Sequence, residues 1–251
     1  MNKTFISRAG RAAFGLALVV SSLHTLAAPL SNGNFAGGLT SWTAQGNASV
    51  QPALAGPSPS GDPAQALIGN SGVLPTYALG STPALSASSL VAALGIPAAA
   101  LDALKQGGDT GNVVFGSALT QAFSTGGGAK LSFNWNFLSD ESSNPLGNDF
   151  AFMVLDGVPT RLANTFTPQS PTVSVFTFET GYVPFTRLLS GGSHTVAFGV
   201  VDVNDSLGSS ALLVDHVTVT PVPEPATLLL VFGGLTALFS LNALLGMTWR
   251  S

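Results

Sequence analysis

Alternation of apolar and polar residues is clearest between positions 131 and 137, where the chain reads Leu-Ser-Phe-Asn-Trp-Asn-Phe. A period of two places the apolar side chains on one face, as in a half-buried antiparallel strand. Seven further β-rich segments are separated by Gly, Pro, Asn or Ser; they are 48–51, 64–68, 112–123, 149–155, 171–179, 193–202 and 211–220. Short strands of this number and spacing predict an all-β fold, an antiparallel β-sandwich.

One stretch has helical composition instead. Ser86 can cap a helix over 86–94 and Gly95 can end it, while Pro97 suits the first turn of a second segment, 97–106. We therefore expect a short helical insertion near 86–106 that crosses one end or edge of the sandwich.

The C-terminal region carries an apolar run from Ala226 to Met247 that no charged residue interrupts. As a helix this run is about 33 Å long, enough to cross a hydrocarbon core of about 30 Å. Trp249 and Arg250 follow it, suited to the interface and to the cytoplasmic side. The sequence predicts a transmembrane helix here.

The N-terminal region has the layout of a secretory signal peptide. Lys3, Arg8 and Arg11 form a basic segment, residues 12–20 form a short apolar segment, and Thr25-Leu26-Ala27 places small residues before a cut after Ala27. We expect residues 1–27 to be removed and the protein to be exported.

The exported part is acidic and lacks cysteine. Between positions 28 and 225 there are four basic and twelve acidic residues, a net charge of −8. Such a balance argues against nucleic acid and against anionic lipid headgroups as partners of the body, and it suits metal cations better. With no cysteine in the chain, no disulfide can stabilise the fold.

Two loops concentrate polar side chains in this charge-poor body. One holds Asp140, Glu141, Asn144, Asn148 and Asp149, and the other holds Asp202, Asn204 and Asp205. If both loops lie at the same end of the sandwich, they offer the oxygen ligands that calcium prefers. The alternative is that these residues form Asx turns and backbone caps.

Strand parity singles out two carboxylates. Asp202 continues the face of Val196, Phe198 and Val200, and Asp215 shares a face with Leu213, Val217 and Val219. A carboxylate on a core-facing position needs hydrogen bonds or a cation. The candidate metal ligands are therefore Asp140, Glu141, Asp149, Asp202, Asp205 and Asp215, with calcium as the possible cofactor.

The C-terminal segment resembles a known sorting signal. The order of a Val222-Pro223-Glu224-Pro225 tetrad, an apolar helix and a terminal basic residue is similar to the PEP-CTERM tail of Gram-negative bacteria. The resemblance implies recognition of the tetrad by an exosortase membrane protease, although such tails usually end in several arginines and here Arg250 stands alone. It divides the chain into a signal peptide (1–27), an exported β-sandwich (28–221) and a sorting and anchor tail (222–251).

Two further resemblances concern the body. The segments 133–141, 148–157, 202–206 and 212–215 look like exported bacterial proteins with interchangeable C-terminal anchors, which implies a jelly-roll-like sandwich. The opening, Asn32-Gly33-Asn34-Phe35 with Gly38-Leu39-Thr40-Ser41-Trp42, is similar to jelly-roll carbohydrate-binding modules. Those modules often carry an acidic residue after the Phe that helps hold a structural calcium, whereas this chain has Ala36.

Catalytic patterns are weak. The mature part has only two histidines, His194 and His216, each in an expected strand, and it contains no Gly-x-Ser-x-Gly or His-Glu-x-x-His motif. Trp42 and Trp135 could stack on sugars or fill the core. We expect a noncatalytic protein of the cell envelope, surface or extracellular matrix that associates with extracellular polysaccharide. The alternatives are a calcium-assisted carbohydrate-binding module and a glycoside hydrolase with two facing carboxylates.

Overall fold

The computed structural model describes residues 29–52, 60–61, 63–70, 82–105, 109–141, 147–167, 170–171, 174, 176–204 and 209–222. The expected signal peptide, the tetrad from Pro223 onward and the apolar run 226–247 lie outside the described residues. Within the described ranges, no helix combines the length and apolar character needed to cross a membrane.

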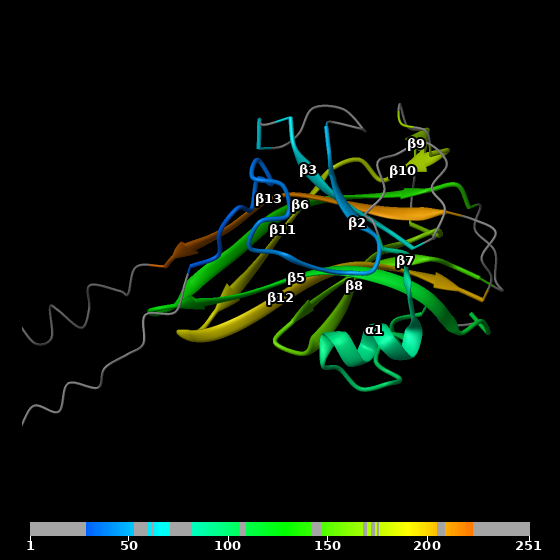
Figure 1. The fold of residues 1–251 in the computed structure, drawn as a ribbon, viewed down its shortest axis with the longest axis horizontal. Coiled ribbons are helices and arrows are strands. Elements are labelled where there is room, and N and C mark those ends of the chain that lie inside the picture. The colour runs from blue at the N-terminus through cyan, green and yellow to red at the C-terminus, as the bar shows by residue number, and fades with distance from the viewer. Residues whose placement is uncertain are drawn as a thin grey trace, which may run out of the picture.

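Two antiparallel sheets stack face to face (Figure 1), which confirms the predicted β-sandwich. The six-stranded sheet has the order β1-β5-β12-β7-β8, with β4 also paired to β5. Its strands are β1 (Thr43–Gln45), β4 (Leu85–Ser86), β5 (Val113–Thr125), β7 (Phe150–Leu155), β8 (Val158–Asn164) and β12 (Gly192–Val203).

The seven-stranded sheet has the order β2-β3-β13-β6-β10-β9, with β11 also paired to β6. Its strands are β2 (Ala48–Gln51), β3 (Gln65–Gly69), β6 (Ala129–Ser139), β9 (Ser170–Pro171), β10 (Phe178–Glu179), β11 (Val183–Leu189) and β13 (Ser210–Pro221). Seven of the eight expected strands correspond to one strand each, while the eighth, 171–179, contributes only the short β9 and β10 near its two ends.

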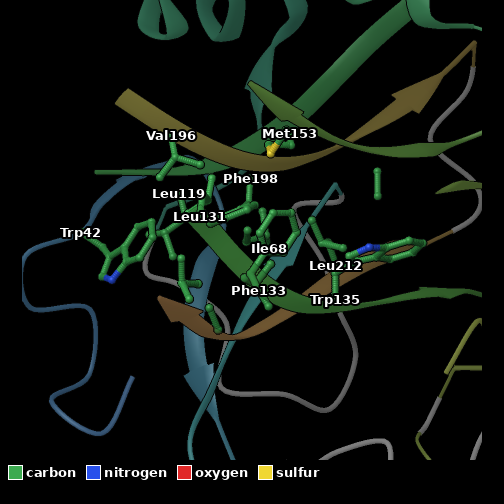
Figure 2. Close-up of a cluster of buried hydrophobic side chains, with 14 of the residues drawn as sticks. Trp42, Ile68, Leu119, Leu131, Phe133, Trp135, Met153, Val196, Phe198 and Leu212 are labelled. Atoms are coloured by element: carbon green, nitrogen blue, oxygen red, sulfur yellow. The ribbon is translucent and has the colours of Figure 1, made fainter. Parts of the chain in front are cut away.

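The main core fills the space between the sheets (Figure 2). The alternating apolar residues of β6, at odd positions from 129 to 137, point inward, and Phe133 meets Phe198 of β12 with ring centroids 4.6 Å apart. Trp42 and Trp135 also belong to this core, with 7% and 6% of their surface exposed. Both tryptophans therefore fill the core and present no stacking surface to a sugar.

Helix α1 (Ala87–Leu94) covers the outer face of the six-stranded sheet (Figure 1). Its caps are those expected, since Ser86 Oγ accepts from Ser89 N at 3.3 Å and Gly95 ends the helix with a φ of 64°. Its position differs from the expected end or edge, because Leu90 and Val91 pack onto a second apolar cluster on that face. The second expected helical segment, 97–106, contains only the single 3₁₀ turn η1 (Asp102–Leu104).

Small residues on β5 and β12 leave room for this outer layer. A Cβ added to Gly199 would lie 2.3 Å from Phe152 Cζ and 2.7 Å from the carbonyl oxygen of Ser117. The backbone oxygen cannot move without disturbing the ladder between β5 and β12. Glycine at 199 is therefore required by the packing of β7 across the sheet.

We predict that Gly199→Ala lowers the free energy of unfolding by about 1–3 kcal/mol, because the extra methyl group overpacks the sheet. Urea denaturation of the mature protein measures the change. Gly126→Ala is the matched control: its added Cβ meets nothing within 4 Å, so the expected change is within about 0.5 kcal/mol. Equal stability of the two variants would contradict this account of the packing.

Candidate functional site

Three of the six candidate metal ligands gather at one end of the sandwich, which we call the acidic end. Glu141 follows β6, Asp149 precedes β7 and Asp202 lies near the end of β12. The charges of Glu141 and Asp202 both raise the pKa of the Asp149 carboxyl, so the three carboxylates lie within electrostatic range of one another. The two polar loops of the sequence therefore meet at the same end.

Asp149 organises this end through several hydrogen bonds. Its Oδ1 accepts from Val203 N at 3.0 Å, and its Oδ2 accepts from Asn70 Nδ2 at 2.5 Å. Asn70 in turn accepts from Ser210 N at 2.9 Å, which links the end of β3 to the start of β13. The carboxyl of Asp149 thus joins β7, β12, β3 and β13, and it is fully buried.

Burial raises the pKa of the Asp149 carboxyl well above its usual range, and the nearby charges of Glu141 and Asp202 raise it further. Hydrogen bonds from Ser210 and Val203 act in the opposite direction and are outweighed. A divalent cation would reverse this balance, because it would favour the ionised carboxylates.

Parity correctly places Asp202 on the core-facing side of β12. Val196, Phe198 and Val200 are all buried in the main core, and Asp202 continues their face with 2% of its surface exposed. In contrast, Asp140 binds a neighbouring segment, since its Oδ1 accepts from Thr177 N at 2.8 Å and from Thr177 Oγ1 at 3.0 Å. Asp205 lies outside the described residues.

Asp215 lies elsewhere, and parity places it correctly on one face with Leu213 but wrongly on one face with Val217 and Val219. A β-bulge interrupts β13 between Asp215 and Thr218, with His216 at a φ of 55°. The bulge switches faces, so that Val217 packs in the main core while Leu213 packs in a cluster on the outer face of the seven-stranded sheet. Asp215 is fully buried, and its Oδ2 accepts from Ser60 N at 2.9 Å.

The side-chain amide of Asn32 holds the loop over residues 32–42, the segment that is similar to carbohydrate-binding modules. In those modules an acidic residue often helps to hold a structural calcium. Asn32 Nδ2 donates to the carbonyl oxygens of Gly38 and Thr40, each at 2.8 Å, and Asn32 Oδ1 accepts from Gly37 N at 3.1 Å. Trp42 Nε1 donates to the carbonyl oxygen of Asn32 at 3.0 Å. The amide therefore satisfies two carbonyl oxygens that a cation could otherwise bind.

A hydrogen bond joins His194, which the sequence placed in an expected strand, to Asp156, which was not among the candidate ligands. His194 Nδ1 is 2.8 Å from Asp156 Oδ2, and His194 Nε2 is 3.1 Å from the carbonyl oxygen of Ser190. Both ring nitrogens therefore lie within hydrogen-bond distance of protein oxygens. A catalytic base needs a ring nitrogen that faces its substrate or nucleophile, whereas here Nε2 faces a backbone carbonyl.

Three hollows surround Asp156, with volumes of ≈ 350, ≈ 250 and ≈ 230 Å³. Asp156 is the single carboxylate in the lining of each. A glycoside hydrolase of the usual kind needs two carboxylates on opposite sides of its substrate. These hollows do not provide that arrangement, and the carboxylates of Asp149 and Asp202 are buried.

No family model matches the sequence, and no curated protein matches it. Among solved structures, the enzymatically active domain of bacteriophage CBA120 tailspike protein 4 is 12% identical, with a TM-score of 0.33, over 78% of this chain and 21% of the tailspike chain. The K3 cleaved adhesin domain of Lys-gingipain from Porphyromonas gingivalis is 12% identical, with a TM-score of 0.32, over 76% and 99% of the two chains.

A third structure, described as "CBM4 structure and function", is 11% identical with a TM-score of 0.28, over 74% of this chain and 97% of the other. The present chain spans about a fifth of the tailspike chain. TM-scores of this size do not establish a shared function, so a function for this chain has to come from its own side chains.

Within the ranges that the structure describes, no three acidic or histidine side chains meet in an arrangement that could hold a metal ion. Calcium at the acidic end stays a prediction, and Asp149 gives it a test. Because the pKa of Asp149 is raised on folding, its contribution to stability is largest below the unfolded value of about 3.9 and is lost as pH rises through the folded value.

We therefore expect the thermal midpoint of the wild type, relative to that of Asp149→Asn, to be highest near pH 4 and to decrease towards pH 7, as measured by differential scanning calorimetry.

Calcium should raise the midpoint of the wild type more at pH 7 than at pH 4, because the cation needs ionised ligands. Asp202→Asn should remove the calcium increment and Asp215→Asn should keep it. A wild type that does not respond to calcium at either pH would exclude the metal.

Proposed function

We propose that this chain is an exported, noncatalytic protein of the cell surface or extracellular matrix, delivered through a PEP-CTERM tail that an exosortase processes. The order of segments carries the proposal. A segment with the layout of a signal peptide precedes the sandwich in the sequence. β13 ends at Pro221, and the Val222-Pro223-Glu224-Pro225 tetrad and its apolar run follow directly in the sequence. The sandwich has its own buried core, so the apolar run is available for the membrane before processing.

We predict that replacing Pro223 and Glu224 by Ala leaves the full tail on the mature protein, because exosortase recognition requires the tetrad. Intact-mass measurement on natively expressed protein gives both termini at once. Pro221→Ala, just upstream of the tetrad, is the control and should still be processed. Measured masses that place the C-terminus at the same residue in the wild type and in the tetrad variant would refute sorting by proteolysis at the tetrad.

The displayed sandwich associates with extracellular polysaccharide through its acidic end. Two exposed aromatic side chains support this location: Phe115 is 39% exposed and pairs with Asp202 across the β5–β12 ladder, and Phe166 is 41% exposed. Phe166 follows Thr165, whose N donates to the carbonyl oxygen of Asp149 at 3.2 Å. Exposed aromatic rings beside polar groups are the usual elements of a sugar-binding surface.

We predict that Phe115→Ala and Phe166→Ala each weaken binding to the polysaccharide by about tenfold, about 1.4 kcal/mol, because a stacking surface is lost. Glycan arrays identify the ligand and calorimetry gives the affinity. Leu188→Ala is the control, since Leu188 is 73% exposed and pairs with Lys130 at the opposite end of β6. Binding unaffected by either Phe substitution would contradict this location.

Two measurements separate the alternatives. Binding that disappears with EDTA would favour calcium-assisted recognition of sugar hydroxyl groups, as in a carbohydrate-binding module. Turnover on a panel of glycosides would favour a glycoside hydrolase and overturn the noncatalytic proposal.

A further inference from the structure

The chain leaves the sandwich at the end opposite to the acidic end. β13 begins at Ser210, whose N is bound to Asn70 beside Asp149, and it runs for 12 residues to Pro221. At about 3.4 Å per residue, the two ends of this strand are about 40 Å apart. Val222 N then donates to the carbonyl oxygen of Gly128 at 2.9 Å, in the turn between β5 and β6. We call this the tail end.

Exposed apolar side chains concentrate at the tail end. Of the five large hydrophobic residues that are exposed in the described part of the chain, three lie here: Val158 at 62%, Leu188 at 73% and Val222 at 43%. Val158 and Leu188 line the same ≈ 250 Å³ hollow, and Leu188 pairs with Lys130 next to the β5–β6 turn. Exposed apolar side chains that are grouped at one end, in contrast to singly scattered ones, mark a surface for a partner.

The same end carries two of the four basic residues of the exported part. Lys130 and Arg187 are exposed and flank Leu188, whereas Lys105 pairs with Asp102 at 3.1 Å, away from the tail end. One described carboxylate lies here, that of Asp156, and it is bound to His194 and to Thr195 N. Glu224 follows Val222 in the sequence, outside the described residues. The net charge of −8 thus conceals a tail end with exposed positive charge.

These observations converge on one partner. We infer that the tail end, formed by Lys130, Val158, Arg187, Leu188 and Val222, rests on the anionic headgroups of a phospholipid bilayer while the chain is membrane-anchored. The inference rests on the proposed function, because it takes the run 226–247 to be the membrane segment. β13 reaches the tetrad without a linker, so the anchored sandwich has this end near the bilayer and its acidic end away from it.

The absence of cysteine from the chain allows a direct test with single-cysteine variants of the full-length protein. Leu188→Cys reports on the tail end, and Asn112→Cys reports on the acidic end, where the exposed Asn112 accepts from Asn204 N at 2.8 Å. Each variant carries a fluorophore and is reconstituted in vesicles of phosphatidylcholine and phosphatidylglycerol that contain a headgroup-attached spin-label quencher. We expect strong quenching at position 188 and little at position 112.

Charge and controls sharpen the test. In one orientation the tail end contacts the bilayer, and in the other it does not. Replacing Lys130 or Arg187 by Gln should lower the ratio of the first orientation to the second about fivefold, and Lys105→Gln should leave it unchanged. Two outcomes would overturn the inference while leaving the anchor intact. One is equal quenching at positions 188 and 112, and the other is quenching at position 188 that is as strong in purely zwitterionic vesicles as in anionic ones. Failure of the full-length protein to float with the vesicles would instead remove the anchor itself, and the proposed function with it.

Discussion

Burial of aromatic and aliphatic side chains between the two sheets is the interaction on which the rest of this structure depends. The chain has no cysteine and few charged residues, so neither disulfides nor ion-pair networks can take over this role. Each fully buried residue such as Phe133 or Phe198 contributes about 1.5–3 kcal/mol of transfer free energy. Because the apolar layer stops where the strands stop, hydrogen-bonded polar groups must close its ends, and the buried carboxyl of Asp149 does so at one of them.

Sequence periodicity predicted the central strands because they are the ones that alternate most strongly. It missed β8 and β11, whose alternation of apolar and polar residues is less regular. Each of these two strands nevertheless has a local feature that explains its place in the sheet. Asp156-Gly157 is a strong turn signal that could have identified the β7–β8 hairpin. β11 contains Pro184, which removes a ladder donor and is found on edge strands. Helix α1 was recognisable from its caps, but only the apolar face of the sheet beneath it determines where it packs.

At the acidic end too, sequence patterns could place residues that depend on a single regular strand, but not residues whose position depends on a bulge or on contacts between distant segments. Continuation of a regular strand was enough to place Asp202 at a buried position. For Asp215 the same reasoning failed, because the bulge at His216 changes the face of the residues that follow, and alternation within the strand does not reveal an inserted residue. The pair of His194 and Asp156 joins residues 38 positions apart, which periodicity within a single strand cannot reveal.

The course of β13 has a mechanical consequence. This strand lies between β3 and β6 and connects the two ends of the sandwich directly. A pull applied at Val222 against a ligand held at the far end acts parallel to β13, so the ladder bonds to both neighbours are strained in shear and share the force. Unzipping from an edge would instead break them one after another. The topology thus suits a protein that has to hold its fold under tension.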